Sequence, residues 1–563
     1  MSKIKRFKSE WPETKQDLRW IAKQNRGITK YVIGFLCISL VSMLFGLASS
    51  VASKYVVDAA IDVSTGFKIE YVLLMLGTTV FAIILSVFTN IFSSYVNEKY
   101  CFSVRAKLFD RVQRGKWLEI TKYHSGDMLS RLTGDVEAVA VNVLTIVPNV
   151  IVTALQLAII LIIVLSTDPV LALIGLIAGP LGAALALVFR KPFSKYQHDL
   201  RESQSEYYTF FQESLSNLGV IKSFELENRN SERFAEIRQR RQKIVMKSAR
   251  LSSFMSATTR MIYSLAYVAA FSWCALQLQR GKYSYGTMTL FLSLVSQIQA
   301  AIGRLGGVIP KIYSTIVCAR RVREITEKPS EKYVLQGHMP ESVGLHMKDV
   351  SFTYEDATVL NNVSLDVAPN SKVGIVGSSG AGKTTLIRML LALVSPDCGE
   401  LQYLDENGTP EDISPDSRRF ISYVPQGNTL MTGTVRENLL VGDPDATDAQ
   451  LWAALTLADA ADFVRKDPRG LELPIKERSN GLSAGQAQRI GIARALLRSR
   501  PVLILDEATS ALDEATERRI FERLSAESEK TCFIITHRSS MLRYCDYVLE
   551  VSDDGTICYR KAE

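Results

Sequence analysis

Six long apolar segments constrain the fold of this chain more than any other feature of its sequence. Each provides the ~20 mainly apolar residues that an α-helix needs to cross a bilayer. They cover residues 31–56, 71–97, 141–166, 169–189, 254–278 and 285–308. One such segment could be a buried helix of a soluble protein, but six together predict a helical membrane domain. Because six is an even number, we expect both ends of this region on one side of the membrane.

Lysine and arginine residues are unevenly distributed among the connections between these segments. The connections after the second and fourth segments are long and basic, as in the cations over residues 229–250. The other connections are short, and Lys68, Arg280 and Lys282 are their main cations. Cytosolic connections carry the excess of Lys and Arg, so we expect both termini and the two basic connections to face the cytosol.

The two basic connections also keep an apolar helical periodicity well beyond the bilayer. This pattern predicts helices that project into the cytosol, with bends near Trp117–His124 and Leu215–Val220. Such bends are well placed to contact a cytosolic domain and to transmit force to it. The alternative is a pair of solvated helical hairpins.

Several polar residues lie within the apolar segments. A charge at mid-bilayer costs ~2.5–3.5 kcal/mol on insertion scales, so Arg260 is expected near a helix end or facing a wet cavity. Polar side chains could line a substrate path or form hydrogen bonds between helices, and the sequence leaves both interpretations open. These side chains are Asn90, Gln156, Ser293, Gln297 and Gln299.

The second part of the chain differs from the first in composition. A chain of 563 residues is too long for a single core, so at least two domains are expected. Helix breakers and charges over 328–332 predict a linker, and short apolar strands then alternate with charged helices. We expect a membrane domain over 1–325, a linker over 326–344 and an α/β domain over 345–563.

Three further features limit the possible functions. The eight cysteines include no CxxC pair, so neither a disulfide framework nor a cysteine metal site is expected. The first apolar run begins only near Tyr31, so no cleavable signal peptide is expected. Residues 11–23 mix apolar and charged side chains, which fits either a helix on the membrane surface or a solvated helix.

A glycine-rich motif organises the α/β domain. The apolar run 373–376 is followed by Gly-Ser-Ser-Gly-Ala-Gly-Lys-Thr and then by a helical pattern, which is the Walker A arrangement. Backbone N–H groups at such a helix start form a cradle for phosphate oxygens. Lys383 can reach the β- and γ-phosphates, and the Thr384 hydroxyl can bind Mg²⁺. The expected nucleotide-binding residues here are Gly377, Ser378, Ser379, Gly380, Ala381, Gly382, Lys383, Thr384 and Thr385.

Polar side chains follow two later apolar strands. Asp506 and Glu507 end the run that begins at Val502, and His537 follows a similar run. Asp506 is suited to coordinating Mg²⁺, and Glu507 is placed to orient or deprotonate a water that attacks the γ-phosphate. We expect His537 to contact the same phosphate. Tyr354 could stack on adenine or could be an ordinary strand aromatic.

The segment 480–489 resembles the LSGGQ signature of ATP-binding-cassette (ABC) proteins, with Ser483, Gly485 and Gln486 at the matching positions. Ala484 stands where the signature has glycine. Other elements agree with this resemblance. They are Gln426 (Q-loop, catalytic and near Mg²⁺), Ser510–Asp513 (D-loop), His537 (switch histidine), Tyr354 (adenine stacking), Glu477–Arg478 (the segment before the signature in exporters) and 126–136 (the exporter loop after the second span).

The order of spans and cassette is similar to that of an ABC exporter half-transporter. The resemblance implies a six-helix membrane domain with long cytosolic extensions, followed by an α/β P-loop ATPase domain. It implies a dimer with two composite sites, in which Lys383 of one chain and Ser483 and Gly485 of the other enclose ATP and Mg²⁺. ATP binding and hydrolysis would then drive a substrate across the cytoplasmic membrane by alternating access.

The partner and the cargo are less constrained. We expect a homodimer, because the change at Ala484 is small and the other catalytic positions are intact, but a heterodimer stays open. An ATP-gated channel or membrane regulator with this architecture is the chief alternative function. The six spans argue against a cassette that acts on nucleic acid. Lipid, peptide and drug cargo all remain open.

Overall fold

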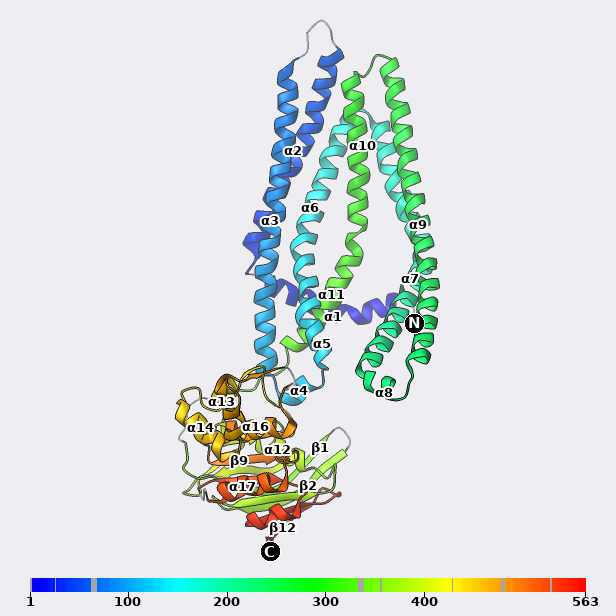
Figure 1. Ribbon diagram of the computed structural model, residues 1–563. Helices are drawn as coiled ribbons and strands as arrows, with labels where there is room; N and C mark the ends of the chain where they lie inside the picture. Colours follow the sequence, from blue (N-terminus) through cyan, green and yellow to red (C-terminus); the bar gives the residue numbers. More distant parts are fainter. Residues whose placement is uncertain are drawn as a thin grey trace. The chain divides into compact units, whose positions relative to one another are not determined.

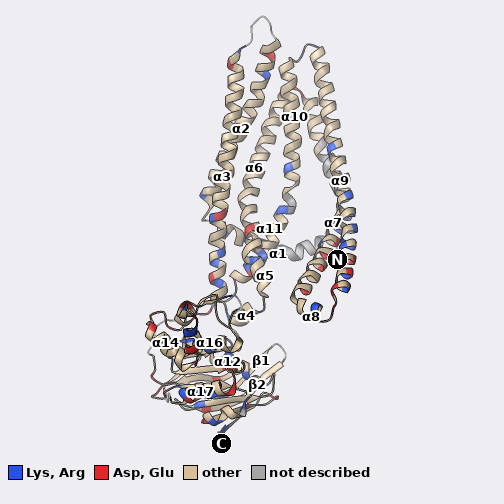
Figure 2. Cartoon of the chain, viewed as in Figure 1, with Lys and Arg blue, Asp and Glu red and all other residues tan. Residues whose placement is uncertain are grey.

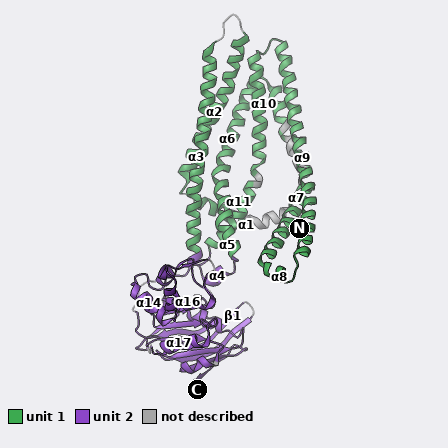
Figure 3. Cartoon of the chain, viewed as in Figure 1, with its two compact units in different colours: residues 1–111, 125–327 green, residues 112–124, 328–563 purple. Residues whose placement is uncertain are grey.

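The computed structural model describes residues 3–25, 27–61, 68–332, 339–354, 357–427, 429–476, 481–526 and 529–562 (Figure 1). The chain forms two compact units (Figure 3). Unit 1 contains residues 1–111 and 125–327, and unit 2 contains residues 112–124 and 328–563. Each unit is described by itself.

Unit 1 is helical. Its long helices run alongside one another (Figure 1). The elements are α1 (Lys3–Asn25), α2 (Thr29–Ile61), α3 (Ile69–Arg114, whose last three residues belong to unit 2), α5 (Ser125–Ser130), the π-helical turn η1 (Arg131–Asp135), α6 (Val136–Thr167), α7 (Pro169–Ser216), α8 (Leu218–Ser223), α9 (Glu227–Gln279), α10 (Tyr285–Gly306) and α11 (Val308–Thr326).

The predicted spans correspond to these long helices. Five of the six lie in helices that are long and apolar enough to cross a membrane, by length and composition. The fourth, 169–189, lies within α7, where several side chains are outside the described part of the structure. Charged residues are sparse in the middle of the long helices and gather towards their ends (Figure 2). This distribution fits a bilayer, because a charged side chain near the middle of the membrane is costly.

The core of unit 1 forms around α10. Val295 and Ile298 of α10 are fully buried, as are Ile160 and Val164 of α6. By contrast, α3 exposes large apolar side chains along much of its length, such as Ile91 at 65%. Exposed apolar surface on this scale marks a face that contacts something other than water.

Helix α1 is held against α11 by a buried carboxylate. The Asp17 side chain is fully buried, and its Oδ2 accepts a 3.1 Å hydrogen bond from Arg320 Nε. Arg323 Nε lies 2.9 Å from Asp17 Oδ1, outside hydrogen-bond geometry. The N-terminal helix is therefore neither fully solvated nor held by the membrane surface alone.

A second charge network holds the segment after α5. Arg131 is buried, and it donates to Asp127 at 2.8 Å, to Glu324 at 2.9 Å and to the Arg321 carbonyl at 2.6 Å. Arg321 in turn pairs with Asp127 and Asp135. These contacts fix η1 against α11, which gives the exporter-like loop over 126–136 a structural role.

The two predicted bends are short helices. α8 lies between α7 and α9 and exposes Leu218 and Val220, so its contact with an ATPase domain stays a prediction. The first bend is α4 (Trp117–Thr121), which belongs to unit 2 and packs on that unit's core. The prediction that the first bend contacts the α/β domain is therefore confirmed.

Unit 2 has an α/β architecture. Its six-stranded sheet has the order β12-β11-β3-β10-β9-β6, with β12 antiparallel to an otherwise parallel sheet. A four-stranded antiparallel sheet has the order β2-β1-β4-β5, and β7 pairs with β8. The strands are β1 (Gly344–Tyr354), β2 (Ala357–Val367), β3 (Lys372–Gly377), β4 (Cys398–Leu404), β5 (Pro410–Asp412), β6 (Ile421–Val424), β7 (Gly433–Thr434), β8 (Pro474–Ile475), β9 (Val502–Asp506), β10 (Thr531–Ile535), β11 (Tyr547–Val551) and β12 (Ile557–Lys561).

Apart from α4, the described helices of unit 2 connect these strands. They are α12 (Lys383–Leu390), η2 (Pro415–Phe420), α13 (Val435–Leu440), α14 (Asp448–Leu457), α15 (Ala461–Lys466), η3 (Gly470–Glu472), α16 (Ala484–Arg498), α17 (Glu514–Ala526) and η5 (Ser539–Tyr544). β9 and β10 are entirely buried, which explains their unbroken apolar sequences. The predicted fold class, a helical membrane domain followed by an α/β ATPase-type domain, is confirmed.

The Asp17→Asn variant tests the docking of α1. It leaves the guanidinium groups of Arg320 and Arg323 without their buried counter-charge, which costs ~3–5 kcal/mol in a fully buried site. Both arginines are partly open to solvent, so the cost should be smaller here. We expect the free energy of unfolding of the purified chain, measured by thermal denaturation, to fall by about 1–3 kcal/mol, and we expect faster proteolysis of α1.

Glu13→Gln is the matched control. Glu13 lies 3.1 Å from Arg320 but is 59% exposed. The free energy of unfolding of Glu13→Gln should therefore fall by less than about 1 kcal/mol. Wild-type stability and wild-type protection of α1 in Asp17→Asn would contradict this account of the docking.

Candidate nucleotide-binding and hydrolysis site

Two glycines bring the turn between β3 and α12 close to neighbouring strands. Gly377 and Gly382 have φ angles of +150° and +111°, which side-chain-bearing residues rarely adopt. A Cβ atom at Gly377 would lie 2.4 Å from the Val551 carbonyl oxygen, and one at Gly382 would lie 3.0 Å from the Val359 carbonyl oxygen. The turn therefore packs closely on neighbouring strands and leads directly into the start of α12, where backbone N–H groups can bind phosphate oxygens.

Lys383 lies over this turn. Its side chain is buried, and Nζ donates hydrogen bonds to the carbonyl oxygens of Gly377 at 2.7 Å and Ser378 at 2.6 Å. Two carbonyl oxygens of the turn thus hold the ammonium group. The phosphate oxygens of a bound nucleotide can replace them as its hydrogen-bond partners. Thr384 follows in the first turn of α12 and is exposed. Its hydroxyl is an oxygen ligand of the kind that Mg²⁺ prefers.

Asp506 ends β9 in a buried position. Tyr423 donates a 3.3 Å hydrogen bond from its hydroxyl to Asp506 Oδ2. Burial raises the pKa of the Asp506 carboxyl above its ordinary value, and the Tyr423 hydrogen bond opposes that rise. A buried carboxylate with one hydroxyl partner favours a cation beside it, so Asp506 and Thr384 fit a Mg²⁺ site.

Glu507 has an unusual backbone conformation. Its φ angle is +49°, in the left-handed region that residues other than glycine seldom occupy. Backbone hydrogen bonds from Glu507 N to Ile535 O and from Ser510 N to Glu507 O maintain this conformation. Strain of this kind costs about 1–3 kcal/mol and tends to occur at functional sites.

The Glu507 carboxylate joins two other predicted site residues. Gln426 Nε2 donates to Glu507 Oε2 at 2.7 Å, and His537 Nε2 lies 3.1 Å from Glu507 Oε1. The three side chains come from the ends of β6, β9 and β10, which are neighbouring parallel strands. The expected base, the Q-loop glutamine and the switch histidine therefore meet at one edge of the sheet.

The signature segment begins α16. Ser483 is the N-cap residue: its Oγ accepts from Gln486 N at 3.2 Å, and Gln486 Oε1 accepts from Ser483 N at 2.9 Å. Ala484 is the first residue of the helix, is exposed and is not among the described residues with positive φ. Its methyl group therefore causes no strain within this chain. A Cβ at Gly485 would lie 2.9 Å from the Ala511 carbonyl oxygen, so glycine is required there for close packing.

Several residues that sequence analysis did not assign fix the D-loop segment. Gln488 donates to Ser510 Oγ at 3.0 Å and accepts from Ala511 N at 3.0 Å. Arg538 donates to the Leu512 carbonyl at 3.1 Å and pairs with the fully buried Glu517. Gln488 and Arg538 each lie within two residues of a motif position, which is the only sequence signal that could have identified them.

Tyr354 is tied to α12 and, through it, to the first bend. Arg388 Nη1 donates to the Tyr354 hydroxyl at 3.2 Å, and the Arg388 guanidinium lies 4.7 Å from the Trp117 ring centre. Lys328 forms an ion pair with Glu119 at 2.5 Å on the same short helix. One arginine thus contacts both the expected adenine-stacking ring and α4.

Not every predicted residue can be placed. Glu477, Arg478 and Asn480, which carry part of the exporter resemblance, lie outside the described residues. Ser483, Gly485 and Gln486 gather at the start of α16, whereas Gln426, Glu507 and His537 gather at the sheet edge. The residue roles remain predictions, because these contacts are those of a single chain.

Two family models match the chain. One, described as the ABC transporter transmembrane region, matches residues 32–302, and the other, described as ABC transporter, matches residues 360–510. The chain is 28% identical to an ATP-dependent lipid A-core flippase of Syntrophus aciditrophicus over 85% of this chain and 81% of that protein. It is 28% identical to YgaD of Bacillus subtilis, named as a multidrug export ATP-binding/permease protein, over 94% and 93% of the two chains. The fold is similar to that of a bacterial Atm1-family ABC exporter with ATP bound, with a TM-score of 0.79, 23% identity and 94% coverage of each chain.

The Trp117→Ala variant tests the attachment of α4. It removes the aromatic ring beneath Arg388 and the apolar contact with the core of unit 2, together worth about 1.5–3 kcal/mol. We expect backbone amides of α4 to exchange with deuterium at least about tenfold faster in the full chain, while those of β3 keep wild-type protection.

Lys122→Ala is the control, because this exposed side chain on the same segment makes a surface ion pair with Glu119 and no other ion pair with the described residues. Its α4 amides should exchange at the wild-type rate. Equal exchange in Trp117→Ala and wild type would show that α4 is held by other contacts.

Proposed function

The chain belongs to the ABC transporter family, and on that premise we propose that it exports a substrate across the cytoplasmic membrane, driven by ATP binding and hydrolysis. The observation that carries this proposal is the meeting of Gln426, Glu507 and His537 at the sheet edge, in a chain that also contains a multi-pass helical membrane unit. The cassette supplies the ATPase activity, and the membrane unit supplies the pathway.

The residues of the site suit in-line attack on a γ-phosphate. The turn 377–382 and Lys383 would hold the phosphates, because this turn offers backbone N–H groups and a buried ammonium. Glu507 would orient or deprotonate the attacking water, and His537 and Gln426 would keep its carboxylate aimed at the γ-phosphate. The strained φ of Glu507 supports a carboxylate whose direction is fixed before ATP arrives.

Mg²⁺ is the expected metal. Thr384, Asp506 and the Gln426 amide would hold it, and when bound it neutralises charge on the phosphate oxygens. Asp506 fits this role because it is buried and, among the described residues, the Tyr423 hydroxyl is the one side chain that donates a hydrogen bond to it.

Two chains are needed for a complete site under this proposal. Ser483, Gly485 and Gln486 of one chain would close on the ATP held by Lys383 of the other, which gives two composite sites in a dimer. We infer a homodimer, because the Ala484 methyl is exposed on an unstrained helix start and Ser483 still serves as the N-cap of α16. ATP-driven closure and hydrolysis would then switch the membrane unit between inward- and outward-facing states.

The location follows from the distribution of charges. We propose that residues 1–325 form the membrane domain, 326–344 the linker and 345–563 the cytosolic ATPase domain, with both termini in the cytosol. The basic connections after the second and fourth spans support this orientation.

Glu507→Gln tests the assigned chemistry. It keeps the shape of the side chain but removes the base, so steady-state ATP hydrolysis should fall at least about 10²-fold while ATP binding persists. Lys383→Ala should instead weaken ATP binding itself, because it removes the ammonium that meets the phosphates. Hydrolysis at the wild-type rate in Glu507→Gln would overturn the assignment of the base.

Expression of this chain alone tests the homodimer. We expect a detergent-solubilised particle with the mass of two chains, whose ATP hydrolysis is lost in Ser483→Arg because the larger side chain blocks closure on the partner's ATP. An inactive chain that gains activity only with a second, different half-transporter would establish a heterodimer instead.

A further inference from the structure

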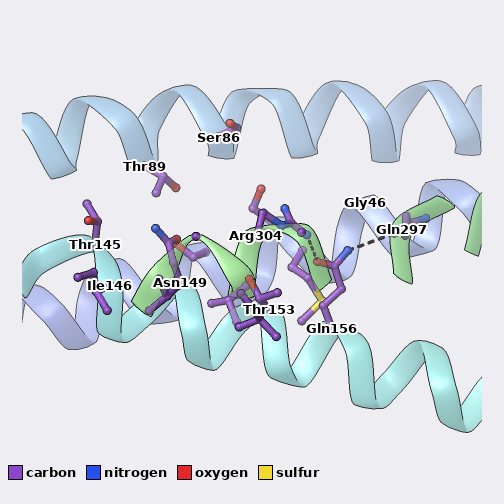
Figure 4. A pocket seen from close by; sticks show the side chains of 18 of the residues that line it. Gly46, Ser86, Thr89, Thr145, Ile146, Asn149, Thr153, Gln156, Gln297 and Arg304 are labelled. Carbon is purple, nitrogen blue, oxygen red and sulfur yellow. Dashed lines mark hydrogen bonds between the residues drawn. The ribbon is translucent and has the colours of Figure 1, made fainter. Parts of the chain in front are cut away.

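A cavity of about 770 Å³ opens among the helices of unit 1. It is lined by side chains of α2, α3, α6, α10 and α11, and Figure 4 shows Thr89 from α3 and Asn149 from α6 beside it. Its volume is in the range of known ligand sites, ~300–1,000 Å³. This inference concerns the cargo of the site and rests on the proposed export function.

The cavity is unusually polar for a site among apolar helices. Hydroxyl and amide side chains face it from several helices, including Ser42, Asn90 and Asn149. Apolar side chains such as Met43 and Val152 complete the lining. A ligand that fits both kinds of surface has a polar head and an apolar part.

A line of hydrogen bonds runs along one side of the cavity (Figure 4). Arg304 donates to Gln156 Oε1 at 2.8 Å, Gln156 donates to Gln297 at 3.2 Å, and Gln297 donates to Ser50 at 3.1 Å. Gln299 differs, since it is buried and donates to the Tyr263 carbonyl at 3.1 Å. Gln299 therefore serves helix packing, whereas Gln156 and Gln297 also face the cavity.

The charged side chains among the described residues that line the cavity are all positive. Arg304 and Lys311 line it, and no aspartate or glutamate is among the described lining residues. In the described part of the chain neither cation has a carboxylate within 4.0 Å, and Arg304 bonds only the neutral Gln156. The arginines further along α11 are different, because Arg320, Arg321 and Arg323 all have carboxylate partners.

The positive-inside rule alone does not explain Arg304. Arg304 lies 19 residues after Tyr285, and Arg260 lies 19 residues before Gln279, on helices that are joined at those ends. At 1.5 Å per residue both are about 28 Å from that end, so they occupy similar depths. Both side chains are exposed, but Arg304 lines the cavity and donates to Gln156, whereas Arg260 is not among the residues that line it. Arg260 and Arg304 therefore lie at similar depths but differ in orientation, because only Arg304 faces the cavity.

We propose that this cavity binds the anionic head group of an amphiphilic cargo through Arg304 and Lys311, with hydroxyl and amide side chains completing its hydrogen bonds. Phosphate, sulfonate and carboxylate heads all offer the acceptors that a guanidinium binds in pairs. Such a head also supplies the counter-charge that both cations lack within the described chain.

Binding to the full chain in phosphatidylcholine nanodiscs tests this proposal. The probes are lysophosphatidic acid and lysophosphatidylcholine with the same acyl chain, and glycerol 3-phosphate as a soluble anion. Wild type should bind lysophosphatidic acid at least about tenfold more tightly than lysophosphatidylcholine, the effect of one hydrogen bond to a charged group. Binding of glycerol 3-phosphate with the same Arg304 dependence would support a soluble anionic cargo, and its failure to bind would support a lipid one.

Matched variants distinguish binding in the cavity from binding at the membrane surface. Arg304→Gln and Lys311→Gln should each lower this preference, and Arg260→Gln should keep all of it. Arg304→Lys should keep only part of it, because lysine retains the charge but not the paired donors. Equal binding of the two lysolipids to wild type would overturn the proposal, and so would equal loss in Arg260→Gln and Arg304→Gln.

The binding is measured without nucleotide, so it is independent of hydrolysis. ATP hydrolysis by the same wild-type sample, and its loss in Glu507→Gln, reports on the proposed function. A chain that hydrolyses ATP without anion preference would therefore refute the cargo class and leave ATP-driven export standing.

Discussion

The parallel pairing of β3, β10 and β9 is the constraint on which the chemistry of this protein depends. Ile535 of β10 lies in register with Ile375 of β3 on one side and with Asp506 of β9 on the other. The phosphate turn, Glu507 and His537 all follow these strands within a few residues, so the same register brings them to one edge. A shift of one residue in any of these strands would turn its side chains to the opposite face and separate the groups.

In the membrane unit, ion pairs rather than strand register hold the elements in position. Asp17, Asp127, Asp135 and Glu324 engage the arginines of α11 and Arg131, which secures α1 and η1. As intact pairs they contribute mainly position, because the cost of burying the charges offsets much of their attraction, whereas removing one partner leaves a charge unpaired and is destabilising. By contrast, among the described residues no carboxylate lies within 4.0 Å of Arg304 or Lys311, and the anionic cargo that we propose would supply their counter-charge.

Much of this architecture could be predicted from the sequence, for identifiable reasons. The spans follow from length and hydropathy, and the positions of Glu507 and His537 follow from buried strands that end in polar residues. The contacts of Asp17, and of Arg388 with Trp117 and Tyr354, could not be predicted, because they join residues that are distant in sequence and no motif specifies which residues pair. Asn90, Gln156 and Gln297 were ambiguous in sequence, since only packing decides whether an amide faces a cavity or a neighbouring helix.

The most direct test of the account follows the accessibility of the cavity through the ATPase cycle. Asn149→Cys, in a chain whose native cysteines are replaced, places a thiol on the cavity wall for reaction with a membrane-impermeant maleimide. The account predicts reaction from the cytosolic side without nucleotide, and from the opposite side only after trapping with ADP and vanadate. Reaction from both sides in one state would contradict alternating access and indicate an ATP-gated channel.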